Sequence, residues 1–236
     1  SMLRGARGNS GVILSILFRG ISKGLEGLDS VDGASIVNAL KLGVDAAYKA
    51  VMKPTEGTML TVVRIAYEKG REAAFFNNDP IFVWEAICKG AKEALETTPE
   101  LLPVLKKAGV VDAGGKGVCL IFDGMLSVFK HGEIISNNVF ELPNQKENEE
   151  SEFSQLIAQF DDDINFTYCT ELIITKSQNV DISVDTLRKF LEQIGDCVVV
   201  VEDDEFIKVH QNDKDNILIV THGGVINVIY HLIKNI

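Results

Sequence analysis

The sequence lacks the features that define several classes of protein. It has four cysteines in 236 residues and no Cys-x-x-Cys pair, which argues against a disulfide framework or a zinc ribbon. It has only five prolines, and no apolar run approaches the roughly 18 to 20 residues that span a bilayer. The charged, apolar and small-residue regions of a signal peptide are also missing. We therefore expect a folded, cytoplasmic protein with no membrane span.

Positive charge is scarce as well. The chain has 23 lysines and arginines against 34 aspartates and glutamates, a formal net charge of −11. A general nucleic-acid-binding surface needs an excess of basic side chains, so no nucleic-acid partner is expected. One nucleotide can still bind, because a nest of backbone N–H groups and a magnesium ion override net charge locally. Acidity also suits a basic protein partner.

Glycine, in contrast, is concentrated at the start of the chain. Residues 5–11, Gly-Ala-Arg-Gly-Asn-Ser-Gly, run directly into an apolar helical pattern. Glycine lets the backbone approach an anion, and the first N–H groups of a helix have no intrahelical partner. Asn9 or Ser10 could cap this helix or bind a phosphate oxygen. The segment therefore predicts either a phosphate-binding helix start or an ordinary helix cap.

The spacing of apolar residues changes along the chain. Up to about residue 135 it follows a helical period, with helices expected at residues 36–51, 60–67, 82–95, 99–108 and 118–129. Asp32 and Gly33 mark the start of the first of these. A polar, acidic stretch at 142–163 follows, and its three aspartates at 161–163 are read as a solvated turn. Strands are then expected at 166–174, 197–201, 206–210 and 217–221, with helices at 184–194 and 225–233.

This pattern predicts a multidomain chain. An all-α helical domain at residues 1–141 is followed by an acidic linker at 142–163 and by a smaller α+β domain at 164–236.

Three segments in this order resemble a known family. They are residues 5–14, residues 53–62 (Lys-Pro-Thr-Glu-Gly-Thr-Met-Leu-Thr-Val) and residues 111–117 (Val-Asp-Ala-Gly-Gly-Lys-Gly). Together they resemble the DhaL-type kinase domain, shared by the nucleotide-binding subunit of dihydroxyacetone kinases and by the bacterial fatty-acid kinase A subunit. Residues 166–171 and 208–210 resemble the second domain of the fatty-acid kinase branch.

The resemblance implies a closed barrel of antiparallel helices with ATP and magnesium at one end. Gly8, Asn9, Ser10 and Gly11 would hold the nucleotide phosphates. Thr58, Met59 and Leu60 would line the nucleotide pocket, and Asp112, Ala113 and Gly114 would close over the base or ribose. Other readings of these residues are that Thr58 is a helix cap and Met59 is core.

The second domain of that branch implies two further residues. It carries a cysteine and two histidines needed for transfer, and it provides a dimer contact. Cys169 matches the cysteine, and His210 matches the first histidine of a His-x-His strand. Asn212 stands at the second histidine position, so the pair is broken. Read without the resemblance, Cys169 is a small buried residue and His210 an ordinary strand residue.

The chain departs from the family in its metal ligands. Such kinases hold two magnesium ions with aspartates in a segment before the glycine-rich helix, and no Asp-Gly-Asp-Thr-Gly-like segment occurs here. No metal ligand is therefore assigned. The resemblance also implies a C-terminal domain that docks the fatty-acid-binding partner, and we expect this chain to lack it. Relative to these kinases we expect a chain that is incomplete at both ends, with little activity of its own.

The tail resembles a different motif. Residues 216–227, with His222 between a strand pattern and two glycines, are similar to the second histidine motif of histidine phosphatases. The Arg-His-Gly segment that those enzymes need is not present. His222 is then part of a strand-to-helix turn, or the tail comes from a fused or misjoined gene.

Three functions follow from these observations. The first is an ATP-dependent kinase subunit that phosphorylates a fatty acid carried by a partner protein. The second keeps the fold but acts on dihydroxyacetone, and the third is a non-catalytic dimerisation or interaction remnant. A helical barrel without its first helices exposes an apolar seam, so an oligomer, most simply a homodimer, is expected.

Overall fold

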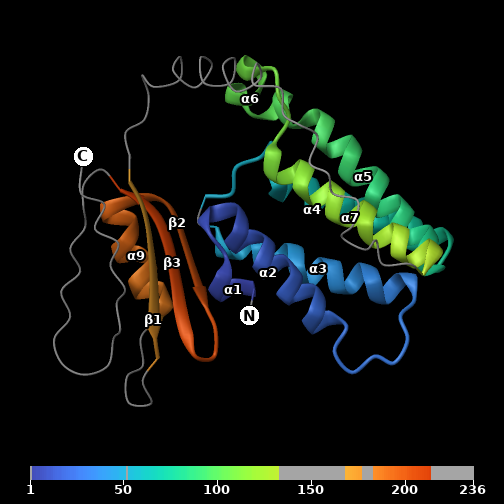
Figure 1. The fold of residues 1–236 in the computed structure, drawn as a ribbon, viewed down its shortest axis with the longest axis horizontal. Helices are drawn as coiled ribbons and strands as arrows, with labels where there is room; N and C mark the ends of the chain where they lie inside the picture. The colour runs from blue at the N-terminus through green and yellow to red at the C-terminus, as the bar shows by residue number, and fades with distance from the viewer. Residues whose placement is uncertain (1, 52, 133–167, 177–182, 214–236) are drawn as a thin grey trace, which may run out of the picture. The chain divides into compact units, whose positions relative to one another are not determined.

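The computed structural model describes residues 2–51, 53–132, 168–176 and 183–213 (Figure 1). A helical part is followed by a small α+β part built on a three-stranded antiparallel sheet, which confirms the expected fold class. The predicted linker, the strand at 217–221, the helix at 225–233 and His222 lie outside the described residues. The domain boundaries drawn from the sequence stay a prediction. None of the described helices is long and apolar enough to cross a membrane.

The described residues pack as two compact units. The first contains those within Ser1–Glu26, Ala39–Thr55 and Asn165–Ile236, and the second contains those within Gly27–Asn38 and Glu56–Ile164. The division passes through a single helix, α3. Each unit is described by itself below.

The helices begin where short polar side chains can cap them. Asp32, Thr58, Asp79 and Asp112 each accept a hydrogen bond from a backbone N–H in the first turn of the helix that follows. The helices are α1 (Met2–Gly5), α2 (Gly8–Gly24), α3 (Gly33–Ala50), α4 (Met59–Phe76), α5 (Pro80–Leu101), α6 (Pro103–Ala108) and α7 (Ala113–His131). The expected start at Asp32 and Gly33 is confirmed.

The predicted helix at 99–108 is wrong. Helix α5 continues through Pro99 to Leu101, and the chain breaks at Leu102, before Pro103. Proline has no N–H, so Pro99 leaves the carbonyl of Leu95 without its helical donor. The hydroxyl of Thr98 donates to that carbonyl at 2.6 Å and replaces the missing hydrogen bond. Leu102 has the extended backbone that a residue before proline favours.

Helix α7 begins five residues earlier than predicted, at Ala113 rather than residue 118. The second glycine-rich segment is therefore the first turn of the helix and not a loop before it. A side chain at Gly115 would place its Cβ 2.8 Å from Val62, so the absence of a side chain lets α7 lie against α4.

Helices α2 and α3 cross in the first unit through glycines. A Cβ at Gly20 would lie 2.4 Å from the Cα of Gly43, and one at Gly24 would lie 2.5 Å from the Cα of Ala39. Contacts this short leave no room for a side chain, so the backbones of the two helices touch directly.

The sheet has the order β1-β3-β2, with β1 (Tyr168–Thr175), β2 (Gly195–Glu202) and β3 (Phe206–Asp213) antiparallel. Helix α9 (Val184–Ile194) connects β1 to β2 and ends at Gly195, as predicted. Each strand ends later than predicted, at Thr175, Glu202 and Asp213 rather than at residues 174, 201 and 210. Strand β3 is the last described strand in the chain but the central one in space.

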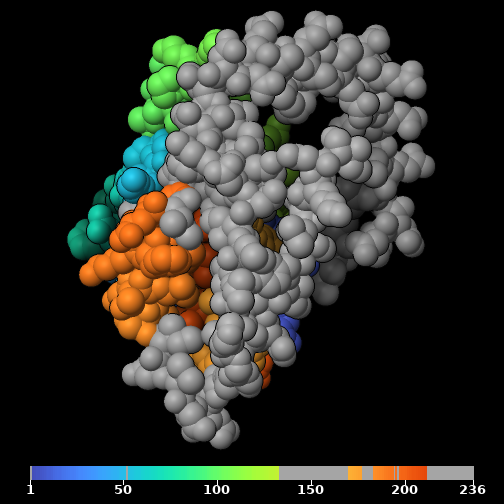
Figure 2. Space-filling model, turned by 90° about the vertical axis from the view of Figure 1, so that its left-hand side faces the viewer, coloured from blue at the N-terminus to red at the C-terminus, as the bar shows by residue number. Residues whose placement is uncertain are grey.

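Both faces of this sheet are covered, which explains the unbroken apolar run 198–201. Val198 and Val200 pack with Leu191 of α9, whereas Val199 and Val201 pack with residues of α1 and α2. Figure 1 shows α9 along the sheet, and Figure 2 shows the outer side of α9 (orange) as an exposed surface. The face with Val199 and Val201 thus carries α1 and α2.

The core of the second unit lies among α4, α5 and α7. Trp84 donates its indole N–H to the carbonyl of Phe122 at 3.0 Å and packs edge-on against the Phe122 ring. Phe122 is fully buried. This ring pair fixes α5 against α7 in the core of the second unit.

Candidate nucleotide and transfer site

The glycine-rich helix start is capped from a distant part of the sequence. Helix α2 begins at Gly8, so Asn9 and Ser10 lie inside its first turn and neither is its cap. Arg7 stands at the cap position and makes no side-chain cap. The N–H of Gly8 donates instead to Oε1 of Glu171 on β1 at 2.7 Å. A carboxylate is favourable here because the N-terminus of a helix carries partial positive charge.

Gly8 itself adopts a left-handed backbone, with φ at +64°. Few residues other than glycine tolerate this conformation, which explains the glycine at the first helical position.

Glu171 also faces a predicted transfer residue. Nδ1 of His210 lies 3.4 Å from Oε1 of Glu171, and the His210 side chain is 3% exposed. Arg7 lies 3.9 Å from Oε2 of the same carboxylate, but its side chain is largely exposed, so this pair contributes little. A carboxylate beside an imidazole fixes the orientation of the ring.

Lys208, two residues before His210 on β3, is buried with 1% of its surface exposed. Its Nζ donates to the carbonyl of Leu3 at 3.2 Å and to the carbonyl of Ala6. Burial lowers the pKa of Lys208, while the nearby Glu171 carboxylate acts in the opposite direction. The lysine therefore binds the backbone where α1 ends, and Glu171 binds the backbone where α2 begins.

The sheet register relates the two predicted transfer residues. Cys169 on β1 has Asn212 on β3 as its partner, and Glu171 has His210. Cys169 and His210 therefore occupy diagonal positions on adjacent strands, which in antiparallel pairs are about 7–8 Å apart. Their catalytic role stays a prediction.

The other two predicted segments meet in the second unit. Thr58, Met59 and Leu60 form the start of α4, and Asp112, Ala113 and Gly114 form the start of α7. A Cβ at Gly114 would lie 3.5 Å from Sδ of Met59, so the two helix starts are neighbours.

Some residues at the starts of α4 and α7 have a structural role, as helix caps or as core residues. Met59 and Leu60 are buried, which fits the reading of Met59 as a core residue. The carboxylate of Asp112 accepts from the N–H of Gly115 at 2.6 Å, and Thr58 caps α4. Ala113 is exposed and Gly114 is half-buried, so these two remain open to a ligand. Whether this pair of helix starts lines a nucleotide pocket stays a prediction.

The start of α2 fits a phosphate group in one further respect. Oδ1 of Asn9 is buried and has no hydrogen-bond partner. Rotation of the amide exchanges its oxygen with its NH₂ group, so the same position can present a donor to an anion. Helix geometry also leaves the N–H groups of the first turn without intrahelical acceptors.

The described residues do not fit a magnesium site. Within the described ranges no three His, Cys, Asp or Glu side chains lie close enough together to hold a metal ion. We therefore assign no metal ligand to this part of the chain.

Two thiols of the second unit have a structural role only. Cys88 and Cys119 are buried, and burial followed by the charge of Asp123 raises the pKa of both, that of Cys88 to about 12. Thiols react as thiolates, so neither residue is a nucleophile at neutral pH.

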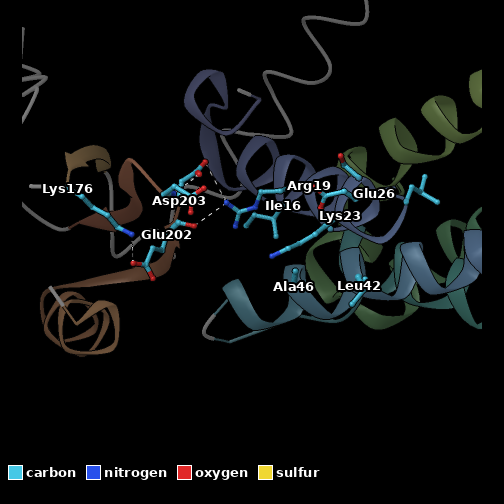
Figure 3. Close-up of a pocket in the computed structure, with 13 residues that line it drawn as sticks. Ile16, Arg19, Lys23, Glu26, Leu42, Ala46, Lys176, Glu202 and Asp203 are labelled. Atoms are coloured by element: carbon cyan, nitrogen blue, oxygen red, sulfur yellow. Dashed lines mark hydrogen bonds and ion pairs between the residues drawn. The ribbon is translucent and has the colours of Figure 1, made fainter. Parts of the chain in front are cut away.

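A cavity of about 1080 Å³ in the first unit contains none of the predicted site residues (Figure 3). Four of its charged side chains are paired with one another. Arg19 lies 3.7 Å from Asp203 and donates to the carbonyl of Glu202, and Lys176 lies 2.6 Å from the carboxylate of Glu202. These two ion pairs therefore offer no unpaired charge to a ligand in the cavity.

The chain combines a helical part, which contains a glycine-rich helix start, with a small sheet domain. Residues 1–127 match the DAK2 domain, and residues 165–228 match the FakA-like middle domain of fatty acid kinases. The chain belongs to the DAK2 domain family, to which the DhaL-type kinases also belong, and this membership implies nucleotide binding in general terms.

Individual proteins are also similar to this chain in sequence. An uncharacterised protein of Staphylococcus saprophyticus is 44% identical over 211 residues, covering 89% of this chain and 38% of that protein. Protein YloV of Bacillus subtilis is 39% identical over 231 residues, covering 98% of this chain and 41% of YloV. The chain thus spans about two fifths of the length of these relatives.

Two residues of the site had no predicted role, Glu171 and Lys208. Lys208 does carry a signal in the sequence, because it interrupts an apolar strand pattern with a charge between Ile207 and Val209. Glu171 lies in the segment 166–171 that resembles the second domain, but the sequence gives no sign of its contact with Gly8, which is 163 residues away.

Proposed function

We propose that this chain is part of an ATP-dependent kinase subunit of the DhaL type that phosphorylates a fatty acid presented by a partner protein. The product of such a transfer is an acyl phosphate. The observation that carries the proposal is the succession of two matches, the DAK2 domain at residues 1–127 and the FakA-like middle domain at residues 165–228.

The arrangement of donors supports phosphate binding at the start of α2. Phosphoryl transfer depends mainly on positioning and on charge stabilisation, which backbone N–H groups supply. The left-handed Gly8, the first-turn N–H groups that follow it and the buried Oδ1 position of Asn9 favour this use. Magnesium would offset the charge between phosphates in such a reaction. Because the described residues offer no cluster of carboxylates, we expect the isolated chain to transfer phosphate poorly.

The middle-domain match favours a fatty acid over dihydroxyacetone as the substrate. A fatty-acid-binding protein is the partner that this substrate implies. The site proposed for transfer is the pair of neighbouring strands with Cys169 and His210, and Glu171 next to His210. Because a kinase of this type needs ATP, the location that we propose is the cytoplasm.

Calorimetric titration with ADP and ATP, with and without magnesium, tests the nucleotide step. We expect both nucleotides to bind, and Asn9→Ala to weaken binding by about tenfold, the effect of one hydrogen bond to a charged group. Asn38→Ala is the matched control, because Asn38 is an exposed asparagine on α3. Adenosine, which has no phosphate, should be insensitive to Asn9→Ala.

Each outcome separates the candidate functions. Binding that depends on magnesium would mean that a metal site exists outside the described residues. Binding without that dependence would leave a phosphate site without its metal. Absence of binding at millimolar nucleotide would contradict the kinase proposal and leave a non-catalytic interaction module.

A further inference from the structure

The turn between α1 and α2 is held on the sheet by two side chains of opposite charge. Lys208 donates to the carbonyl of Leu3 in α1 and to that of Ala6 in the turn, and Glu171 accepts from the N–H of Gly8, where α2 begins. The two residues stand on neighbouring strands, one on β1 and one on β3. Lys208 therefore holds the carbonyl groups before and in the turn, and Glu171 holds the N–H group that follows it.

The register places these charges next to each other on one face of the sheet. Glu171 is the partner of His210, and Lys208 is the partner of Ile173, two positions along β1. The same face packs against Leu3, Ala6, Val12 and Ile16. A charged lysine in this apolar layer is costly unless it is fully hydrogen-bonded, and an apolar residue would fill the space at lower cost. The hydrogen bonds of Lys208 fix the position of the backbone at Leu3 and Ala6.

Glu171 uses only the first N–H group of α2. The N–H groups of Asn9 and Ser10, which follow it, have no acceptor within the helix and remain available to an anion. The orientation of these groups depends on the conformation of the turn, and Gly8, with φ at +64°, is by its nature a permissive residue. A turn that contains such a residue is held in one conformation more firmly when side chains outside it bind its backbone.

We propose that Glu171 and Lys208 are positioning residues that fix the turn 5–8 and so orient the first-turn N–H groups of α2 toward a nucleotide phosphate. The inference rests on the proposed function, because it assigns the phosphate to that helix start. It also connects that helix start to His210, since one carboxylate contacts both. The middle-domain sheet thus shapes the phosphate site in addition to carrying the proposed transfer residues.

The test compares Glu171→Ala, Glu171→Gln and Lys208→Met with the wild-type chain. The glutamine keeps an oxygen that accepts from Gly8, whereas the alanine has no acceptor, and methionine keeps the stem of the lysine without its donors. Glu192→Ala is the control, because Glu192 is an exposed glutamate on α9. Two quantities are measured for each variant, amide hydrogen exchange by NMR and ADP affinity by calorimetry.

Glu171→Ala should raise the exchange rate of the Gly8 amide and weaken ADP binding, each by about tenfold, the loss expected for one charge-assisted hydrogen bond. Exchange at Val209, in the centre of the sheet, should not change, and this separates a local effect from general destabilisation. Glu171→Gln should restore both values to within about threefold of the wild type, since a neutral acceptor retains part of such a bond. Lys208→Met should accelerate exchange at Gly8 as well.

Unchanged exchange at Gly8 in Glu171→Ala would overturn the positioning role, whatever the nucleotide result. ADP binding that is equal or tighter in Glu171→Ala would also overturn it, because the carboxylate would then compete with phosphate. Unchanged exchange in Lys208→Met would remove Lys208 from the proposal. If the wild-type chain bound no ADP, the proposed function and the role toward phosphate would both fail, whereas the exchange data would still report on the turn itself.

Discussion

Single acidic side chains perform distinct tasks in this chain, and each task follows from the groups around the carboxylate. Asp79 and Asp112 accept one N–H each at a helix start. Glu171 does the same for α2 from another part of the sequence and lies beside a histidine. Asp32 accepts from both the N–H and the hydroxyl of Ser35 and from the amide of Asn78. The number of donors decides how strongly the ionised form is favoured.

Asp32 should therefore make the start of α3 sensitive to acid. The side-chain and backbone hydrogen bonds of Ser35, followed by the amide of Asn78, lower its pKa from 3.8 to about 2. Because the folded-state pKa lies below the ordinary value, the stabilisation is complete above 3.8 and is lost as the pH falls toward 2. The carboxyl carbon shift of Asp32, followed by NMR, should titrate with a midpoint near 2.

Variants provide a second measurement. The amide of Asp32→Asn does not take up a proton in this pH range, so the free energy of unfolding of this variant should fall less than that of the wild type. Asp29→Asn, at an exposed aspartate in the preceding turn, serves as control. Identical acid profiles for the wild type and Asp32→Asn would contradict the assignment.

Helix α5 shows how one side chain allows an element to pass a residue that normally ends it. The hydroxyl of Thr98 donates to the carbonyl that Pro99 leaves without a donor and also accepts from the N–H of Asp112 at 3.1 Å. Thr98 is fully buried, so both groups would be unsatisfied without it. The same hydroxyl thus completes α5 and fixes the backbone just before α7.

Thr98→Val should lower the free energy of unfolding by about 1–3 kcal/mol, because it buries a donor and an acceptor without partners. Thr97→Val is the control: its hydroxyl donates to the carbonyl of Ala94, but the side chain is exposed and that carbonyl already has a helical donor. Its cost should stay within about 0.5 kcal/mol. Urea unfolding followed by circular dichroism measures both, and equal costs would contradict the role of Thr98.

The whole molecule combines a strong negative charge with exposed apolar side chains. The formal net charge is −11. Large apolar residues are exposed at several places among the described residues, with Phe75 and Phe76 at the end of α4 more than four-fifths exposed. Exposed apolar surface favours association, whereas like net charge opposes it. The proposed oligomer therefore depends on which of the two dominates.

Self-association should increase with salt for this reason. The Debye length falls from about 30 Å at 0.01 M to about 8 Å at 0.15 M ionic strength, which screens the repulsion between copies but leaves apolar contacts intact. Sedimentation equilibrium at several protein concentrations should give a dimer or larger species at 0.15 M salt, and a smaller average mass at 0.01 M. A monomer at both salt concentrations would contradict the proposed oligomer.

The local features of the fold could be predicted from the sequence. The helix at 184–194 has its predicted bounds, and Asp32 and Thr58 cap the helices that they precede. Each of these features depends on residues within a few positions of one another, so short-range patterns suffice. The break at Leu102 was not predicted from the sequence. Helix α5 continues past Pro99 because the hydroxyl of Thr98 donates a hydrogen bond, and the spacing of apolar residues gives no sign of that bond.

The candidate site was predictable only in part. The sequence by itself determined that a glycine-rich segment opens α2, that Cys169 and His210 lie on strands, and that a DhaL-type resemblance extends over both parts, because these depend on residue order alone. Only the tertiary structure decided that β3 is the central strand, that Glu171 contacts both Gly8 and His210, and that Lys208 is buried against the end of α1. The physical reason is that these contacts join segments up to 205 positions apart, whose meeting depends on the packing of whole elements.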